Sequence, residues 1–172
     1  MRVLHLTDPH LFADRRGALR GAVTYDTLQL VIAHYLDSDF EADFIALTGD
    51  IVQDDSAEAY AHCHELVSSL GLPVLCVPGN HDVRSLMRDL LPDPPFSYCG
   101  SIESGNWLIT GIDSCSAGRA GGRIAERALR RMEEAIAASS AGHVMVCLHH
   151  PPVPMHSKWL DTVGLDNGDE FL

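Results

Sequence analysis

Four short apolar runs in this chain are each followed at once by acidic, amide or histidine side chains. The four clusters are Leu6-Thr-Asp-Pro-His10, Gly49-Asp50, Gly79-Asn-His-Asp82 and His149-His-Pro-Pro152. Open α/β sheets place their ligand crevice outside the carboxyl ends of the strands, so clusters in these positions can converge on one point. Aspartate, asparagine and histidine are also the side chains that hold catalytic divalent metals. The pattern therefore predicts an α/β fold with a metal site at one edge of the sheet.

The segments around these clusters alternate between strand and helix patterns. Strands are predicted over residues 3–7, 44–48, 74–77, 107–112 and 143–148, and helices over 25–37, 55–70, 84–90 and 124–139. Asp55 and Glu58 resemble a capping box at the start of the second helix. The alternation indicates a parallel sheet, and the turn residues 103–106 predict a hairpin that adds antiparallel character. We interpret residues 1–172 as a single domain.

Composition limits the possible partners and surroundings of the chain. Its 12 Lys and Arg residues against 24 Asp and Glu residues give a formal charge of −12, which argues against binding to a nucleic-acid polymer. The five cysteines are odd in number and include no Cys-x-x-Cys pair, which favours a reducing compartment. We find no signal peptide pattern and no stretch of membrane-span length. We expect a cytoplasmic protein without a membrane partner.

The polar clusters differ in how specific they are. Asp8 with His10, and likewise the Gly49-Asp50 pair, can each be explained as an ordinary turn. Three consecutive polar residues at 80–82 after a buried run serve no packing purpose, and they point to function. His5, by contrast, alternates with core positions, so we expect it to be buried with a structural role. The metal prediction depends on the four clusters taken together.

The order Asp-x-His, Gly-Asp, Gly-Asn-His-Asp and His resembles the calcineurin-like metallophosphoesterase superfamily, from Val3 to the end of the chain. The resemblance implies a four-layer α/β/β/α sandwich and a centre with two divalent metal ions. It implies that Asp8 and His10 bind the first ion, that Asp50 bridges both ions, and that Asn80 and His149 bind the second. Manganese, iron, zinc and cobalt all suit such a mixture of oxygen and nitrogen ligands.

Two residues carry catalytic roles in this interpretation. Asp50 offsets the mutual repulsion of the two cations, which together hold a bridging hydroxide and a phosphoryl oxygen for in-line attack. The resemblance places His81 beside the metals rather than on them, as a transition-state stabiliser or proton donor. The implied activity is metal-dependent hydrolysis of a phosphoric ester.

The chain also departs from the family pattern. Members carry a later Gly-His-x-His motif that completes both metal shells, and this chain has none. The part that supplies much of the second sheet is missing as well, so we expect an incomplete domain. One consequence is a catalytically impaired metal-binding fragment. Another is association of two copies into a homo-oligomer, since a bare apolar sheet face promotes association.

Some segments narrow the substrate class. The segments are Gly49-Asp-Ile-Val52, Ile112-Asp-Ser114, Trp159-Leu-Asp161 and Gly164-Leu-Asp-Asn167. They resemble the bacterial class III cyclic-nucleotide phosphodiesterase branch, although the neighbouring glycerophosphodiesterases share most of the same features. The resemblance implies a small phosphodiester substrate. We favour 3′,5′-cyclic AMP, with glycerophosphodiesters as the alternative.

Overall fold

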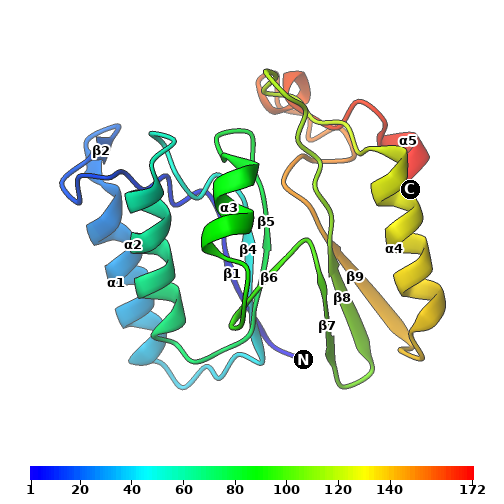
Figure 1. The fold of residues 1–172 in the computed structure, drawn as a ribbon, viewed down its shortest axis with the longest axis horizontal. Coiled ribbons are helices and arrows are strands. Elements are labelled where there is room, and N and C mark those ends of the chain that lie inside the picture. The colour runs from blue at the N-terminus through cyan, green and yellow to red at the C-terminus, as the bar shows by residue number, and fades with distance from the viewer.

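Two β-sheets pack face to face in the computed structural model, which describes residues 1–172 (Figure 1). The first sheet is parallel, in the order β1-β4-β5-β6. Its strands are β1 (Val3–Leu6), β4 (Phe44–Thr48), β5 (Val74–Val77) and β6 (Phe96–Tyr98). In the second sheet β8 (Trp107–Gly111) pairs antiparallel with β7 (Ser101–Ser104) and parallel with β9 (His143–Cys147). The predicted hairpin before β8 is therefore confirmed.

Helices cover the outer faces of both sheets. The first sheet is covered by α1 (Thr24–Leu36), α2 (Ala57–Ser68) and α3 (Arg84–Leu90), while α4 (Glu126–Ala138) covers the second (Figure 1). Smaller elements are the hairpin of β2 (Ala18–Leu19) and β3 (Ala22–Val23), the 3-10 turn η1 (Leu160–Thr162), and α5 (Gly168–Phe171). None of these helices has the length and apolarity needed to cross a membrane. The arrangement confirms the predicted α/β/β/α sandwich.

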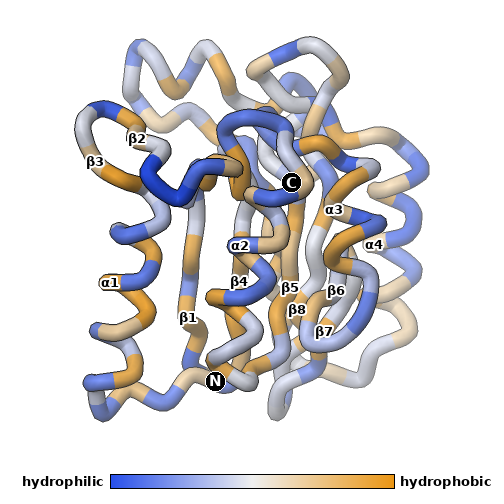
Figure 2. Tube along the Cα trace, turned by 60° about the vertical axis from the view of Figure 1, so that its left-hand side comes forward, coloured by the Kyte–Doolittle hydropathy of each residue, from blue (hydrophilic) through white to orange (hydrophobic).

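The strand β4 shows why this sequence builds two cores. All five of its residues are buried, as expected for a parallel strand covered on both faces. Side chains alternate along a strand, so Ile45 and Leu47 join the helix-side core of 18 buried residues. Phe44 and Ala46 point the other way, into a smaller cluster of five buried residues that links the two sheets. Figure 2 shows hydrophobic positions recurring along the strands.

Two local predictions were wrong. His5 is exposed rather than buried, because β1 is the edge strand of its sheet. The N-cap of α2 is Ser56, whose side chain accepts a hydrogen bond from the Ala59 N–H group, and not Asp55. Asp55 has φ 54°, whereas an N-cap residue requires the extended backbone that Ser56 adopts. The predicted capping box therefore does not form.

Candidate metal centre

The loops that follow β1 and β4 are bonded along their backbones. The Asp8 N–H group donates to the Gly49 carbonyl oxygen at 3.1 Å, and the His10 N–H group donates to the Asp50 carbonyl oxygen at 3.0 Å. Leu11 continues the pairing with a 2.8 Å hydrogen bond to the Ile51 carbonyl oxygen. The two strand-end clusters thus lie side by side, as their order in the sequence predicts.

Backbone conformation shapes this edge of the sheet. Asp8, His10 and Asp50 all have positive φ, at 53°, 45° and 49°. Non-glycine residues rarely adopt this left-handed conformation, and such strain concentrates at functional sites. Gly49, with φ 94°, lies so close to the next loop that an added Cβ would be 2.6 Å from the Gly79 nitrogen and 2.7 Å from His149 Nδ1. The two loops and the histidine therefore meet without room for a side chain at Gly49.

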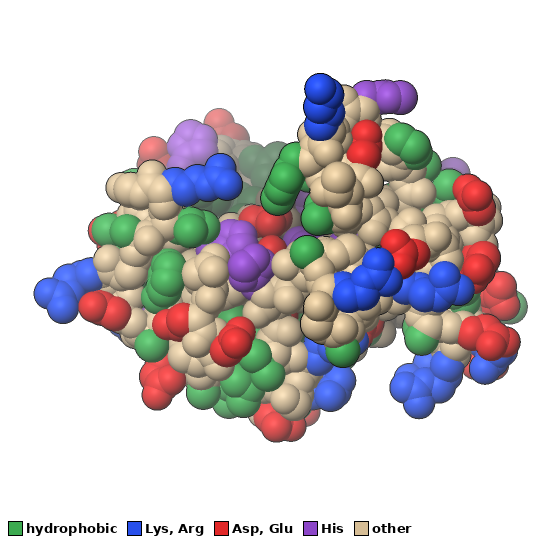
Figure 3. Space-filling model, turned by 90° about the horizontal axis from the view of Figure 1, so that it is seen from above, with side chains coloured by type: hydrophobic (Ala, Val, Ile, Leu, Met, Phe, Trp, Pro, Cys, Tyr) green, Lys and Arg blue, Asp and Glu red, His purple; other side chains and the backbone are tan.

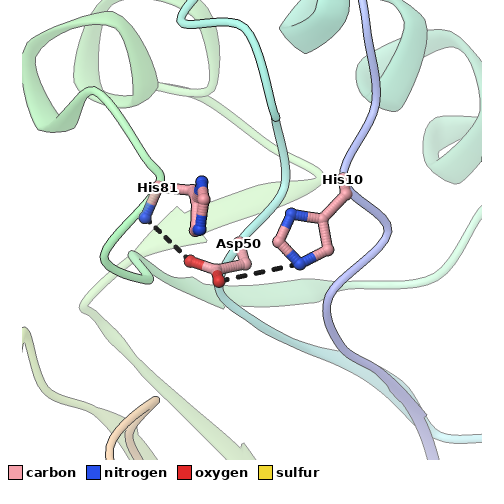
Figure 4. Close-up of side chains that lie close together, drawn as sticks. All are labelled: His10, Asp50 and His81. Carbon is pink, nitrogen blue, oxygen red and sulfur yellow. Dashed lines mark hydrogen bonds and ion pairs between the residues drawn. The ribbon is translucent and has the colours of Figure 1, made fainter. Parts of the chain in front are cut away.

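Asp50 is shared by two groups of potential metal ligands. His10, Asp50 and His81 offer ligand atoms that all lie within 4.8 Å of one another, and so do Asp8, Asp50 and His149. The Asp50 carboxylate is buried and accepts a 2.9 Å hydrogen bond from the His81 backbone N–H group (Figure 4). Seen from above, histidine and acidic side chains lie at the bottom of a hollow near the centre of the molecule (Figure 3). A buried carboxylate flanked by ligands on both sides is the arrangement that a metal pair requires.

His149 reaches this point from the second sheet, in the loop after β9. Its Nδ1 atom lies 2.9 Å from the Thr48 carbonyl oxygen, which can only accept, so Nδ1 carries the proton. Its Nε2 atom, the one available to a metal, lies 3.6 Å from Asp50 Oδ1. Metal-binding histidines are commonly oriented in this way, by a second hydrogen bond to a backbone carbonyl group. The packing of the two sheets therefore presents Nε2 of His149 to Asp50.

The distances around His10 show whether these residues fit a metal ion. Its Nε2 atom lies 3.8 Å from Asp8 Oδ1 and 3.7 Å from Asp50 Oδ2. These separations are too long for hydrogen bonds, but both atoms of each pair can bind one ion at about 2.0–2.2 Å. Burial lowers the pKa of His10, with His81 and His149 also lowering it against the opposing effect of Asp50 and Asp8. A neutral imidazole is the form that binds metals, so the donor set fits.

Asp82 is an important residue of the site to which the sequence assigned no role. Its largely buried carboxylate accepts hydrogen bonds from the N–H groups of Ile51 (3.0 Å) and Gly79 (2.8 Å) and from the Tyr60 hydroxyl group (3.0 Å). Burial raises the pKa of Asp82, and these hydrogen bonds oppose the rise. The carboxylate joins the loop that carries Asp50 to the loop that carries His81. Its position as the last residue of the third cluster was the only signal in the sequence.

The structure brings together five of the predicted residues, Asp8, His10, Asp50, His81 and His149. Asp8 lies near both histidines: its Oδ1 atom is 3.8 Å from His10 Nε2, and it also belongs to the group with Asp50 and His149. Asn80 is half-buried in the same loop as His81, and its role as a metal ligand stays a prediction. How the ligands divide between two ions stays a prediction as well.

Other polar residues near the site have structural partners. His150 is buried, with Nδ1 2.8 Å from the Ser114 hydroxyl oxygen and Nε2 3.0 Å from the Ala120 carbonyl oxygen. The buried Asn167 side chain bonds both backbone groups of Ile124. Of the two adjacent histidines after β9, only His149 therefore faces Asp50.

These features define a class of protein, a four-layer sandwich with a candidate site for two metal ions at the strand ends. The chain belongs to the calcineurin-like phosphoesterase family, whose model matches residues 1–167. A crystal structure of TT1561 from Thermus thermophilus has the same fold, with a TM-score of 0.60 and 18% identity over 90% of this chain and 70% of that one. The predicted superfamily is confirmed.

Curated relatives carry more specific names. The chain is 36% identical to the 3′,5′-cyclic adenosine monophosphate phosphodiesterase CpdA of Escherichia coli (strain K12), over 99% of this chain and 62% of the relative. It is 33% identical to the CpdA protein of Haemophilus influenzae, over 99% of this chain and 63% of that protein. It is 30% identical to a probable cyclic nucleotide phosphodiesterase of Synechococcus, over 66% of that protein. The chain thus spans less than two thirds of the length of these relatives.

Proposed function

We propose that this chain carries metal-binding residues of a phosphodiester hydrolase that acts on 3′,5′-cyclic AMP. The observation that carries the proposal is the buried Asp50 carboxylate, which belongs to both groups of potential metal ligands. The substrate is supported by the names of the CpdA relatives at 36% and 33% identity. Geometry supports metal-dependent chemistry, and the relatives support the substrate.

In this proposal Asp8, His10, Asp50, Asn80 and His149 hold two divalent ions, with Asp50 between them. When bound, such ions lower the pKa of water and neutralise charge on the phosphoryl oxygens. Thr48 contributes through its carbonyl group, which fixes the tautomer of His149. Asp82 holds the two loops at a constant separation. The buried protein groups thus set the geometry before any substrate arrives.

His81 is the proposed proton donor. Its backbone is fixed by the hydrogen bond to Asp50, while the residue as a whole is exposed at the rim of the site. The His81 and His10 rings meet edge to face, with centroids 5.0 Å apart. A proton on the His81 imidazole would pass to the departing alkoxide oxygen as the P–O bond breaks. An exposed side chain on a fixed backbone can reach substrate from this position.

We further propose a cytoplasmic protein that binds manganese, iron, zinc or cobalt. The support is the mixed oxygen and nitrogen donor set, together with five cysteines that are all free. Its formal charge of −12 supports a small substrate rather than a nucleic-acid polymer. Association into a homo-oligomer stays a prediction.

The first test measures bound metal. The chain should bind two Mn²⁺ ions in calorimetric titration, and Asp50→Asn should lose at least one of them while retaining its far-UV circular dichroism spectrum. Asp55→Asn is the matched control, because Asp55 is also an aspartate with positive φ (54°) but lies outside both ligand groups. Two ions retained by Asp50→Asn would refute the shared-ligand role.

The second test measures turnover with added Mn²⁺. Cyclic AMP and bis-p-nitrophenyl phosphate should be hydrolysed faster than the p-nitrophenyl monoester. Faster hydrolysis of the monoester would contradict the phosphodiesterase proposal, and preference for glycerophosphocholine over cyclic AMP would contradict the substrate. Two bound ions without turnover of any ester would identify this chain as a metal-binding fragment and contradict the hydrolase proposal for it.

A further inference from the structure

A second cavity, of about 800 Å³, lies between α3 and α4 at the edge where the chain passes from β6 to β7. None of the candidate metal ligands lines it. Its walls combine the Tyr98 ring and small apolar side chains of α4 with an unusual number of arginines. The arginines are Arg84, Arg88, Arg123, Arg127 and Arg131. The volume lies in the range of small-molecule sites, about 300–1,000 Å³.

The charge of this cavity is opposite to that of the whole chain. Five of the 12 basic side chains line it, and Asp113 is the only carboxylate among the lining residues, although the chain carries a charge of −12. Figure 3 shows basic side chains gathered at the lower right of the molecule, around a notch in its outline. The two cysteines in the wall, Cys99 and Cys115, add no negative charge because burial raises the pKa of each thiol. The cavity therefore favours anions.

The arginines divide into fixed and free groups. Arg84 is held by Asp113 at 3.4 Å and by the Cys115 carbonyl oxygen at 3.0 Å, and Arg123 pairs with Glu170 at 3.3 Å. Arg127 and Arg131 form no ion pair, and they lie one turn apart on α4, on the same side of the helix. Two unpaired guanidinium groups thus face a wall that is already positively charged.

We propose that this cavity binds a small anion carrying two or more phosphate groups, at a site separate from the metal centre. Guanidinium groups match phosphate oxygens through paired N–H donors, and several arginines around one cavity can share the phosphates of one ligand. The guanidinium carbon of Arg88 lies over the Tyr98 ring, 5.9 Å from its centroid, so the ring supports one of these cations at the cavity wall. A nucleoside diphosphate carries the two linked phosphates that these arginines would accommodate. The inference does not depend on the proposed phosphodiesterase activity.

Calorimetric titration of the metal-free chain with inorganic pyrophosphate and with ADP, in buffer free of divalent ions, tests the proposal. We expect both to bind with a Kd below about 1 mM. Arg127→Gln combined with Arg131→Gln should weaken binding by roughly tenfold or more, because charge-assisted hydrogen bonds are lost. Both residues are exposed and unpaired, so the fold should persist, which circular dichroism will check.

The matched control is Arg130→Gln, which removes one positive charge from α4, as Arg127→Gln alone does, but lies outside the cavity. It should leave the Kd unchanged. Equal weakening by the control and the double variant would show diffuse charge attraction and overturn the proposal. The proposal also fails if neither anion binds, if the double variant binds normally, or if Asp50→Asn weakens binding, since that would place the anion at the metal centre.

Discussion

The two sheets of this molecule differ sharply in how they are packed. The first sheet and its three helices enclose a core of 18 buried residues. The second sheet shares a cluster of only five with the first, and none of the residues of α4 is fully buried. Burial of apolar surface is the main stabilising contribution to a fold. The first sheet with its three helices, the first half of the molecule, therefore supplies most of the stability.

The candidate site follows the same division. Asp8, His10, Asp50 and His81 all come from loops of the first sheet, and only His149 comes from the second. Because rigid elements position ligands more precisely than mobile ones, most of the site stands on the better packed half. The second sheet delivers one histidine, which is fixed by its contact with Thr48 of the first. The less densely packed second sheet therefore contributes a ligand to the site by docking against the first sheet, and not through a core of its own.

The largest expected effect is a loss in the free energy of unfolding when the core of the first sheet is truncated. Leu47→Ala removes a side chain that is 1% exposed in β4, whereas Leu129→Ala removes a half-buried one from α4. We expect Leu47→Ala to lower the free energy of unfolding by about 3–5 kcal/mol, since it leaves a cavity in a close-packed core. Leu129→Ala should cost less than about half of that. Urea denaturation of both variants measures the difference, and equal losses would show that the two halves are packed equally well.

Much of the first half could be predicted from the sequence, because its signals are local. The buried strand 44–48 and the helical face at Leu28 and Ile32 are visible as apolar runs and as 3.6-residue periodicity. The strand-end positions of the polar clusters follow from the parallel order of the strands. Local pattern is therefore enough to predict where the candidate site lies.

The rest depends on contacts between distant segments. Asp82 binds Ile51, 31 residues away, and His149 binds Thr48, 101 residues away, so neither partner can be read from a neighbouring pattern. Tertiary placement also explains the error at His5, whose strand lies at an open edge. On α4 the apolar stripe was predicted correctly, but the stripe gives no information on how deeply the helix is buried.

A smaller effect tests the junction between the halves. Gly49→Ala places a Cβ 2.7 Å from His149 Nδ1 and 2.6 Å from the Gly79 nitrogen, at a φ of 94°. We expect a loss of more than about 2 kcal/mol in the free energy of unfolding, because close contact adds to backbone strain. Mn²⁺ affinity, measured by calorimetry, should fall as well, because His149 is pushed away from Asp50.

Gly105→Ala is the control for strain alone. Gly105 also has a positive φ, 57°, but nothing lies within 4 Å of its added Cβ. It should cost only about 1–2 kcal/mol and leave Mn²⁺ affinity unchanged. If both variants bind Mn²⁺ normally, the close packing at Gly49 does not position His149.

The smallest effect concerns the long loop of the first half, which contacts α2 near its middle. Burial lowers the pKa of His62 below its ordinary value of 6.5, and Arg15, whose Nε atom lies 3.4 Å from His62 Nε2, lowers it further. The unfolded chain therefore takes up a proton at His62 before the folded chain does. Stability present above pH 6.5 is lost as the pH falls through the lower folded pKa. Arg15→Gln should raise the pKa of His62 in an NMR titration and make this loss smaller.

The control is Arg16→Gln. The Arg16 side chain pairs with Asp14, so its loss should leave the His62 titration unchanged. An unchanged pKa in Arg15→Gln would show that the loop does not hold Arg15 against α2 in solution, and that close packing in this half is confined to its core.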